Sequence, residues 1–173
     1  MEKLRKNLKA YVSIVSKMNL MVAHVVGVAL LIFGAIMLYE AISRHFFNSP
    51  TTWAYEYSKM LFGFYMIFGG GYTMLCCEHI SMDLFYSKWP QRTKAIVDSI
   101  TFIFFVLFFS TLLYLITDDA INSISFRETS NSTLAQPLYQ WRASLVVGVL
   151  LLFLQGIAGF VKNIWFAIFQ EEL

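Results

Sequence analysis

Four long apolar stretches, almost free of charge, alternate with shorter polar stretches along the chain. The charge-free runs cover residues 18–39, 60–77, 99–117 and 143–161, and a charged side chain bounds each end of every run. About 20 helical residues cross the roughly 30 Å hydrocarbon core of a bilayer, so each run can span it. Helices are expected, because lipid offers no hydrogen-bond partners to a backbone. The pattern predicts an all-α integral membrane protein, a single domain over residues 1–173, with spans at about 18–43, 55–77, 95–118 and 138–166.

The first 17 residues have a different pattern, which is amphipathic at helical spacing. One face collects the apolar residues Leu4, Leu8, Tyr11, Val12 and Val15, and the opposite face collects Lys6, Lys9 and Lys17. Such a helix can lie in the membrane interface with its lysines near anionic lipid. We therefore expect residues 1–17 to form an interfacial helix that precedes the first span.

Composition supports a lipid environment. Hydrophobic residues make up 58% of the chain and charged residues 14%, whereas soluble domains carry about 25% charged residues. The net charge of +2 is too small to indicate a nucleic-acid partner. The two cysteines, Cys76 and Cys77, are adjacent and indicate no redox compartment.

The basic residues predict the orientation. Nine fall on one side of the predicted spans: Lys3, Arg5, Lys6, Lys9, Lys17, Lys88, Arg92, Lys94 and Lys162. Four fall on the other: Arg44, Lys59, Arg127 and Arg142. By the positive-inside rule the side with nine, which holds both termini, faces the cytoplasm.

The spans hold few groups that could carry chemistry. His24 is the one ionisable residue well inside a run, and no motif of an enzyme active site is found, so no enzymatic activity is expected. His24, His45 and His79 leave open an alternative, a membrane anchor of a respiratory complex that binds haem or quinone. A self-contained small carrier or channel is a third possibility.

Charged groups instead gather at the ends of the spans. Glu40 and Arg44 are spaced to pair along one helix face, and Asp118 and Asp119 close the third span on the same side of the membrane. These groups are interpreted either as solvated helix ends or as a docking surface for another protein.

The stretch from Arg44 to Asp83 resembles the small membrane subunit (DctQ type) of tripartite ATP-independent periplasmic (TRAP) transporters. The resemblance is carried by Arg44, Phe47, Asn48, Pro50, Trp53, Glu56, Gly69, Gly70, His79, Ile80 and Asp83, and later by Pro90, Arg92, Pro137, Gly148 and Gln155. It extends over nearly the whole chain.

The resemblance implies a subunit of the bacterial inner membrane that acts with two partners. A larger multi-span subunit would carry sodium and substrate, and a periplasmic binding protein would deliver an organic acid. The small subunit would scaffold the large one, help dock the binding protein and bind no cofactor itself. The implied docking candidates are Arg44, Asn48, Trp53, Glu56, Asp118, Asp119 and Arg127. Arg44, Trp53 and Glu56 could equally brace the bundle from within.

Overall fold

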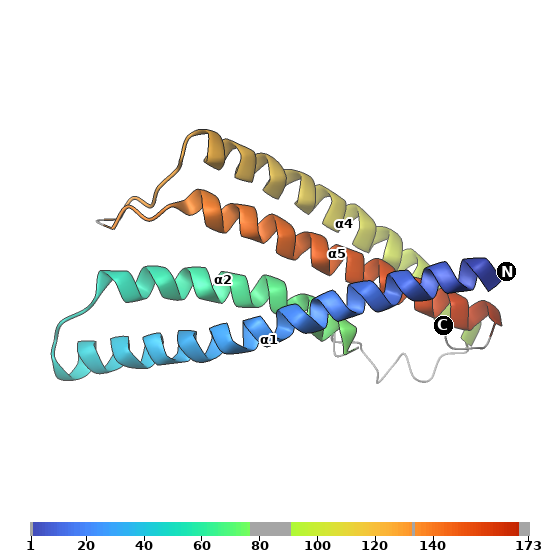
Figure 1. Cartoon of the computed structure of the whole chain (residues 1–173), viewed down its shortest axis with the longest axis horizontal. Helices are drawn as coiled ribbons and strands as arrows, with labels where there is room; N and C mark the ends of the chain where they lie inside the picture. The colour runs from blue at the N-terminus through green and yellow to red at the C-terminus, as the bar shows by residue number, and fades with distance from the viewer. Residues whose placement is uncertain (1, 77–90, 133, 170–173) are drawn as a thin grey trace.

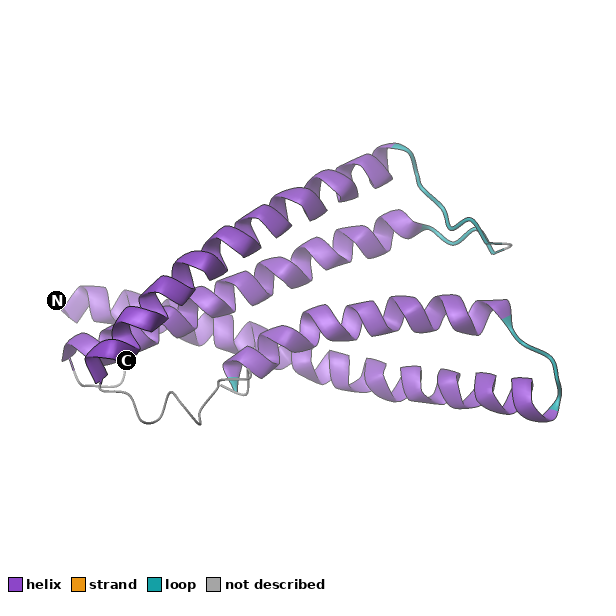
Figure 2. Ribbon diagram, turned by 180° about the vertical axis from the view of Figure 1, so that it is seen from behind, coloured by secondary structure: helices purple, strands orange, loops and turns teal. Residues whose placement is uncertain are grey.

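The chain folds into long helices. The structure is a computed structural model that describes residues 2–76, 91–132 and 134–169. These residues form α1 (Glu2–Phe46), α2 (Thr52–Leu75), α4 (Gln91–Ser125) and α5 (Leu138–Phe169), with one isolated β-bridge between Thr129 and Pro137. The all-α prediction is confirmed, and Figure 2 shows helices joined by loops throughout the described chain.

Three of the described helices are long and apolar enough to cross a membrane. The qualifying stretches are Arg5–Phe46, Ile100–Ser125 and Leu138–Trp165. α2 has 24 residues and is not among them; it carries Glu56 and Lys59 near its start and three adjacent glycines further along. The predicted span at 55–77 overlaps α2 but ends at Cys77, outside the described residues, so a fourth crossing stays a prediction.

The interfacial helix predicted for residues 1–17 is not a separate element. α1 runs without a break for 45 residues, from Glu2 to Phe46, or roughly 67 Å at the rise of an α-helix. Its expected apolar face packs against another helix and not against lipid. Val12 and Val15 are buried against Ala158 of α5, and the Tyr11 hydroxyl donates to the Leu154 carbonyl at 3.1 Å. Since α5 covers this face and the segment has no proline, the helix continues past residue 17 without a break.

The helices pair as two hairpins, α1 with α2 and α4 with α5 (Figure 1). α5 packs against all three other helices, whereas α4 packs chiefly against α5. The connections 47–51 and 126–137 lie at one end of the bundle, which we call the loop end. The start of α1 and the end of α5 lie at the opposite end, which we call the terminal end.

Glycines allow the helices to approach closely around α5. A Cβ at Gly156 would meet the ring of Phe105 on α4, and one at Gly148 would lie 2.6 Å from Ile67 on α2. Small residues permit such approach in membrane bundles. A larger side chain at either glycine would force α5 away from α4 or from α2.

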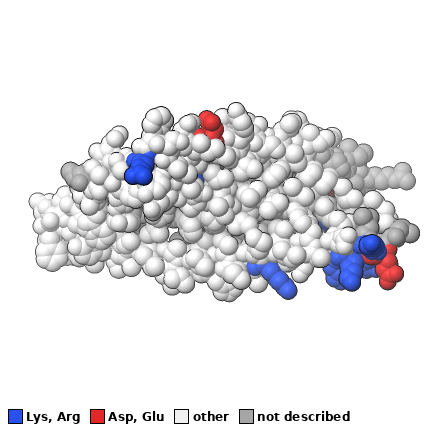
Figure 3. All heavy atoms as spheres, turned by 45° about the horizontal axis from the view of Figure 1, so that its top comes forward, with Lys and Arg blue, Asp and Glu red and all other residues white. Residues whose placement is uncertain are grey.

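The charged side chains are unevenly distributed. On the face shown in Figure 3 most of the surface is uncharged, and the largest group of basic side chains lies toward the terminal end. Much of the uncharged surface is apolar and exposed, including Phe104, Leu107 and Phe108 on α4. A water-soluble monomer rarely exposes so continuous an apolar surface.

Candidate functional site at the loop end of the bundle

Glu40 joins the end of α1 to the start of α2. Its carboxylate accepts hydrogen bonds from Arg44 Nη2 at 2.8 Å, from the backbone N–H of Thr51 at 3.2 Å, and from the Thr51 hydroxyl. The Glu40–Arg44 pair predicted from their spacing is confirmed. Thr51 is the N-cap residue of α2, and its hydroxyl bonds Glu40 instead of capping the helix. One carboxylate thus fixes the first connection.

Asn48 shapes the same connection. Its backbone is left-handed, with φ 49°, a conformation that asparagine adopts more readily than most residues. Ser43 closes the turn, because its hydroxyl donates to the Ser49 carbonyl at 2.7 Å while its carbonyl accepts from the Ser49 N–H at 3.2 Å. The place of Asn48 in the sequence is therefore explained by the turn itself.

Trp53 belongs to an aromatic cluster on the first hairpin. Its ring centroid lies 5.6 Å from that of Tyr39 on α1 and 6.4 Å from that of Tyr57 on α2. Tryptophan and tyrosine favour the headgroup level of a bilayer, where an apolar ring and a polar tip are both satisfied. This cluster indicates that the loop end lies at a membrane surface.

Glu56 joins α2 to the second connection at this end of the bundle. One carboxylate oxygen accepts a long hydrogen bond, 3.5 Å, from the hydroxyl of Ser130 in the second connection. The other oxygen is buried and has no partner among the described residues. The side chain therefore points into the bundle and not toward a free surface.

Arg142 closes the second hairpin. Its guanidinium contacts Asp119 at the end of α4 and, through Nη2 at 2.9 Å, Glu128 in the connection. Sequence reasoning listed Asp119 as a docking candidate and missed Glu128, which pairs with Arg142 only because the connection folds back. Backbone bonds from Ser130 N–H to Gln136 O and from Leu138 N–H to Glu128 O hold that fold at 2.7 and 2.9 Å.

The remaining candidates face outward. Asp118 is exposed, with Asn122 as its hydrogen-bond partner at 3.3 Å on the same helix. Arg127 is exposed, and its side chain makes no bond or ion pair within the described chain. The Arg44 side chain is 63% exposed beyond its pair with Glu40. The seven candidates thus differ in their contacts. Trp53, Glu56 and Asp119 contact another helix or connection, although Trp53 and Asp119 are themselves exposed, and Asn48 forms a turn. Arg44, Asp118 and Arg127, the outward group, are exposed and contact no other helix within the described chain.

A second polar contact lies deep in the bundle, and sequence reasoning missed its α1 member. Asn19 on α1 donates from Nδ2 to Gln155 Oε1 on α5 at 3.1 Å and to the Val15 carbonyl at 3.1 Å. Asn19 is 1% exposed and Gln155 is 3% exposed. Gly71 of α2 faces Asn19 so closely that a Cβ there would collide with its amide. An uncharged polar residue inside an apolar run was the available signal, since buried polar groups in a membrane need partners.

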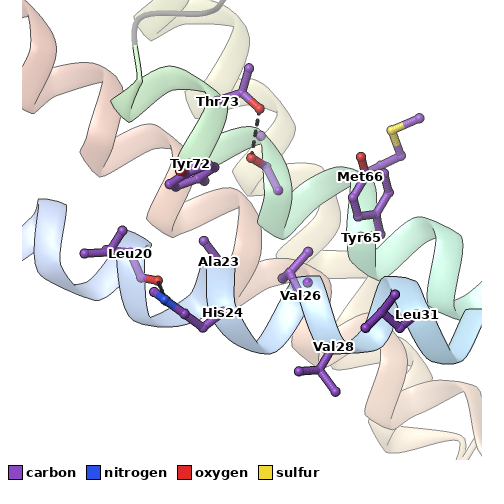
Figure 4. Close-up of a pocket in the computed structure, with 13 residues that line it drawn as sticks. Leu20, Ala23, His24, Val26, Val28, Leu31, Tyr65, Met66, Tyr72 and Thr73 are labelled. Atoms are coloured by element: carbon purple, nitrogen blue, oxygen red, sulfur yellow. Dashed lines mark hydrogen bonds between the residues drawn. The ribbon is translucent and has the colours of Figure 1, made fainter.

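His24 borders an open groove between α1 and α2. The groove has a volume of about 660 Å³ and an apolar lining that includes Val26, Tyr65 and Met66 (Figure 4). His24 Nδ1 donates to the Leu20 carbonyl at 2.8 Å, because a carbonyl can only accept. His45 lies near the far end of the same helix, so these two histidines cannot share a haem, and His79 lies outside the described residues.

These features define a helical membrane protein. Its long helices are apolar, hydrogen bonds and ion pairs hold the connections at the loop end, and the Asn19–Gln155 bond joins two helices in the interior. The profile of the tripartite ATP-independent periplasmic transporter DctQ component matches residues 33–165. The chain therefore belongs to the DctQ family and is a small membrane subunit of a TRAP transporter, a transport component. Searches of curated proteins and of solved structures gave no match.

Proposed function

We propose that this subunit is the fixed scaffold of a sodium-dependent transporter for organic acids. A larger multi-span subunit would bind sodium and substrate, and this chain would have no catalytic activity and no cofactor. The observation that carries the proposal is the exposed apolar surface of α4, whose most apolar stretch has 0% of its residues buried within the chain. Such a surface suits a partner helix or lipid, and DctQ components act within a larger transporter.

Co-expression with the large subunit tests the scaffold. We expect the two proteins to purify together from membranes, and we expect this chain alone in sodium-loaded vesicles to transport no organic acid. Sodium-driven accumulation of an acid by the chain alone would overturn the proposal, because a scaffold has no substrate pathway.

We further propose that the loop end docks the periplasmic binding protein through its outward group. Arg44, Asp118 and Arg127 present charge to solvent, so a partner can reach them without breaking the bundle. Trp53, Glu56 and Asp119, which contact other elements of the bundle, instead hold the loop end in shape. Of the seven candidates, three are therefore proposed to contact the binding protein, and the others are proposed to support the structure of the loop end.

Charge reversal separates the two roles. Asp118→Lys should weaken affinity for the binding protein about tenfold while leaving the unfolding temperature unchanged, because rim charges act on association and not on the fold. Glu2→Lys is the matched control, since it makes the same change of charge at the terminal end. Unchanged affinity and uptake for Asp118→Lys, Arg127→Glu and Arg44→Glu would rule out docking at these residues.

The proposed setting is the bacterial inner membrane with both termini in the cytoplasm. It is supported by the nine basic residues predicted on that side and by the position of the start of α1 and the end of α5 at one end of the bundle. The loop end would then face the periplasm, where the binding protein is.

A further inference from the structure

Three lysines from two helices line one groove at the terminal end. Lys9 and Lys17 of α1 and Lys162 of α5 border a space of about 320 Å³ that Leu75 of α2 also lines. Among the described residues, the lining of this groove contains no acidic side chain. None of the three lysines makes an ion pair within the described part of the chain.

The groove also offers hydroxyl groups. Ser13 and Ser16 line it, and the Ser16 hydroxyl oxygen is buried with no partner among the described residues. Hydroxyls beside ammonium groups are donors suited to phosphate oxygens. Asp98 lies in the neighbouring groove on the other side of Lys162, so the excess of positive charge is confined to the α1 side.

This basic groove continues into the apolar groove between α1 and α2. Leu20 lines both, one turn before His24. The apolar groove is open where glycines replace side chains: a Cβ at Gly27 would have nothing within 4 Å, and Gly69 makes only ordinary contacts. Figure 4 shows Ala23 and Val26 facing Tyr65 and Tyr72 across it. The basic groove thus adjoins the apolar groove at Leu20, and the two run along the same helices.

We propose that these two grooves form one binding site for an anionic phospholipid. The phosphate would lie among Lys9, Lys17 and Lys162, and an acyl chain would lie along Gly27 and Gly69. Basic pockets between membrane helices favour anionic headgroups, and each lysine near the surface contributes about fivefold in affinity. The proposal requires a membrane setting and does not depend on the role of the subunit in transport. The lipid would occupy the junction of α1, α2 and α5, beside the Asn19–Gln155 contact.

Native mass spectrometry of the delipidated full chain in detergent tests the site. We expect one phosphatidylglycerol to bind at concentrations where phosphatidylcholine does not. The triple variant Lys9→Gln, Lys17→Gln, Lys162→Gln should lose roughly a hundredfold in affinity for phosphatidylglycerol, about fivefold for each lysine. The triple variant Arg44→Gln, Lys59→Gln, Arg127→Gln removes the same charge at the loop end, away from the groove, and should change the affinity less than threefold. Circular dichroism verifies that both variants keep their helix content.

The acyl channel has its own pair of variants. Gly27→Leu should weaken phosphatidylglycerol binding about tenfold, because the new side chain fills the channel. Gly34→Leu is the control, since Gly34 lies two turns further along α1, has equally open surroundings and does not line the groove. Millimolar glycerol 3-phosphate should not displace the lipid, because a free headgroup lacks the acyl contacts.

Several outcomes would overturn the proposal. Equal binding of phosphatidylglycerol and phosphatidylcholine, or full binding by the groove triple variant, would remove the basis for an anionic headgroup. Displacement by glycerol 3-phosphate would indicate a simple phosphate site. Loss of the lipid when the large subunit is present would assign the groove to a partner helix.

Discussion

α4 and α5 adjoin in sequence, are similarly apolar and have nearly equal length, yet their surroundings differ. In the most apolar stretch of α5, 33% of the residues are buried, against 0% for α4. α5 contacts three helices and carries the polar residue Gln155, whereas the phenylalanines of α4 divide between α5 and the outside. The difference shows that apolar content marks both helices as membrane-embedded, while glycines and an uncharged polar group distinguish the central helix from the peripheral one.

The largest effect is expected where α5 meets α4. Gly156→Leu places a side chain against the Phe105 ring, so we expect it to destabilise the bundle by about 2 kcal/mol, the usual cost of overpacking. Gly159→Leu, one turn along α5, has open space and should change the stability by less than about 0.5 kcal/mol. Thermal unfolding in detergent, followed by circular dichroism, measures both. Equal effects of the two variants would mean that α4 does not pack tightly on α5.

A smaller effect is expected at the contact of α5 with α1. Asn19→Ala leaves Gln155 without its partner in the interior, at a cost of about 1–2 kcal/mol. A double-mutant cycle with Gln155→Met should give a coupling energy of about 0.6 kcal/mol and at most about 1.7 kcal/mol, the average and maximum for interhelical hydrogen bonds in a membrane protein. Additive effects of the two substitutions would contradict a direct bond.

The smallest effect on stability is expected at the loop end of α4 and α5, where Arg142 holds the second connection. Arg142→Met removes two ion pairs, with Asp119 and Glu128, whose side chains are 59% and 38% exposed. Exposed pairs contribute below about 1 kcal/mol, so the melting temperature should hardly move. Limited proteolysis within residues 126–137 should nonetheless become several-fold faster, because the connection loses its anchor. Arg127→Met, which breaks no contact within the described chain, serves as the control.

Local features were predictable from the sequence, and pairings between distant residues were not. Apolar run length and the four-residue spacing of Glu40 and Arg44 are properties of single helices, so both could be derived without tertiary structure. The Asn19–Gln155 bond joins residues 136 apart in sequence, and no periodicity reveals it. Glu128 likewise reaches Arg142 only after the second connection folds.

The amino-terminal segment shows how a correct pattern can lead to a wrong helix boundary. The apolar face of residues 1–17 was recognised, but an apolar face can be covered by lipid or by another helix. Ala158 and Leu154 of α5 cover it here, so α1 stays straight through residue 17. Whether lipid or another helix covers the apolar face depends on tertiary packing, which the sequence of a single helix does not determine.

The unbroken course of α1 makes it a rigid rod that crosses the full height of the protein. Since its rise gives roughly 67 Å, more than twice the thickness of a hydrocarbon core, the rod links the region around Lys9 with the corner held by Glu40. Because the helix continues unbroken on both sides of the Asn19–Gln155 contact, a tilt of one end would carry through to the other. A force applied near the amino terminus would therefore be felt at the opposite surface without any hinge between them.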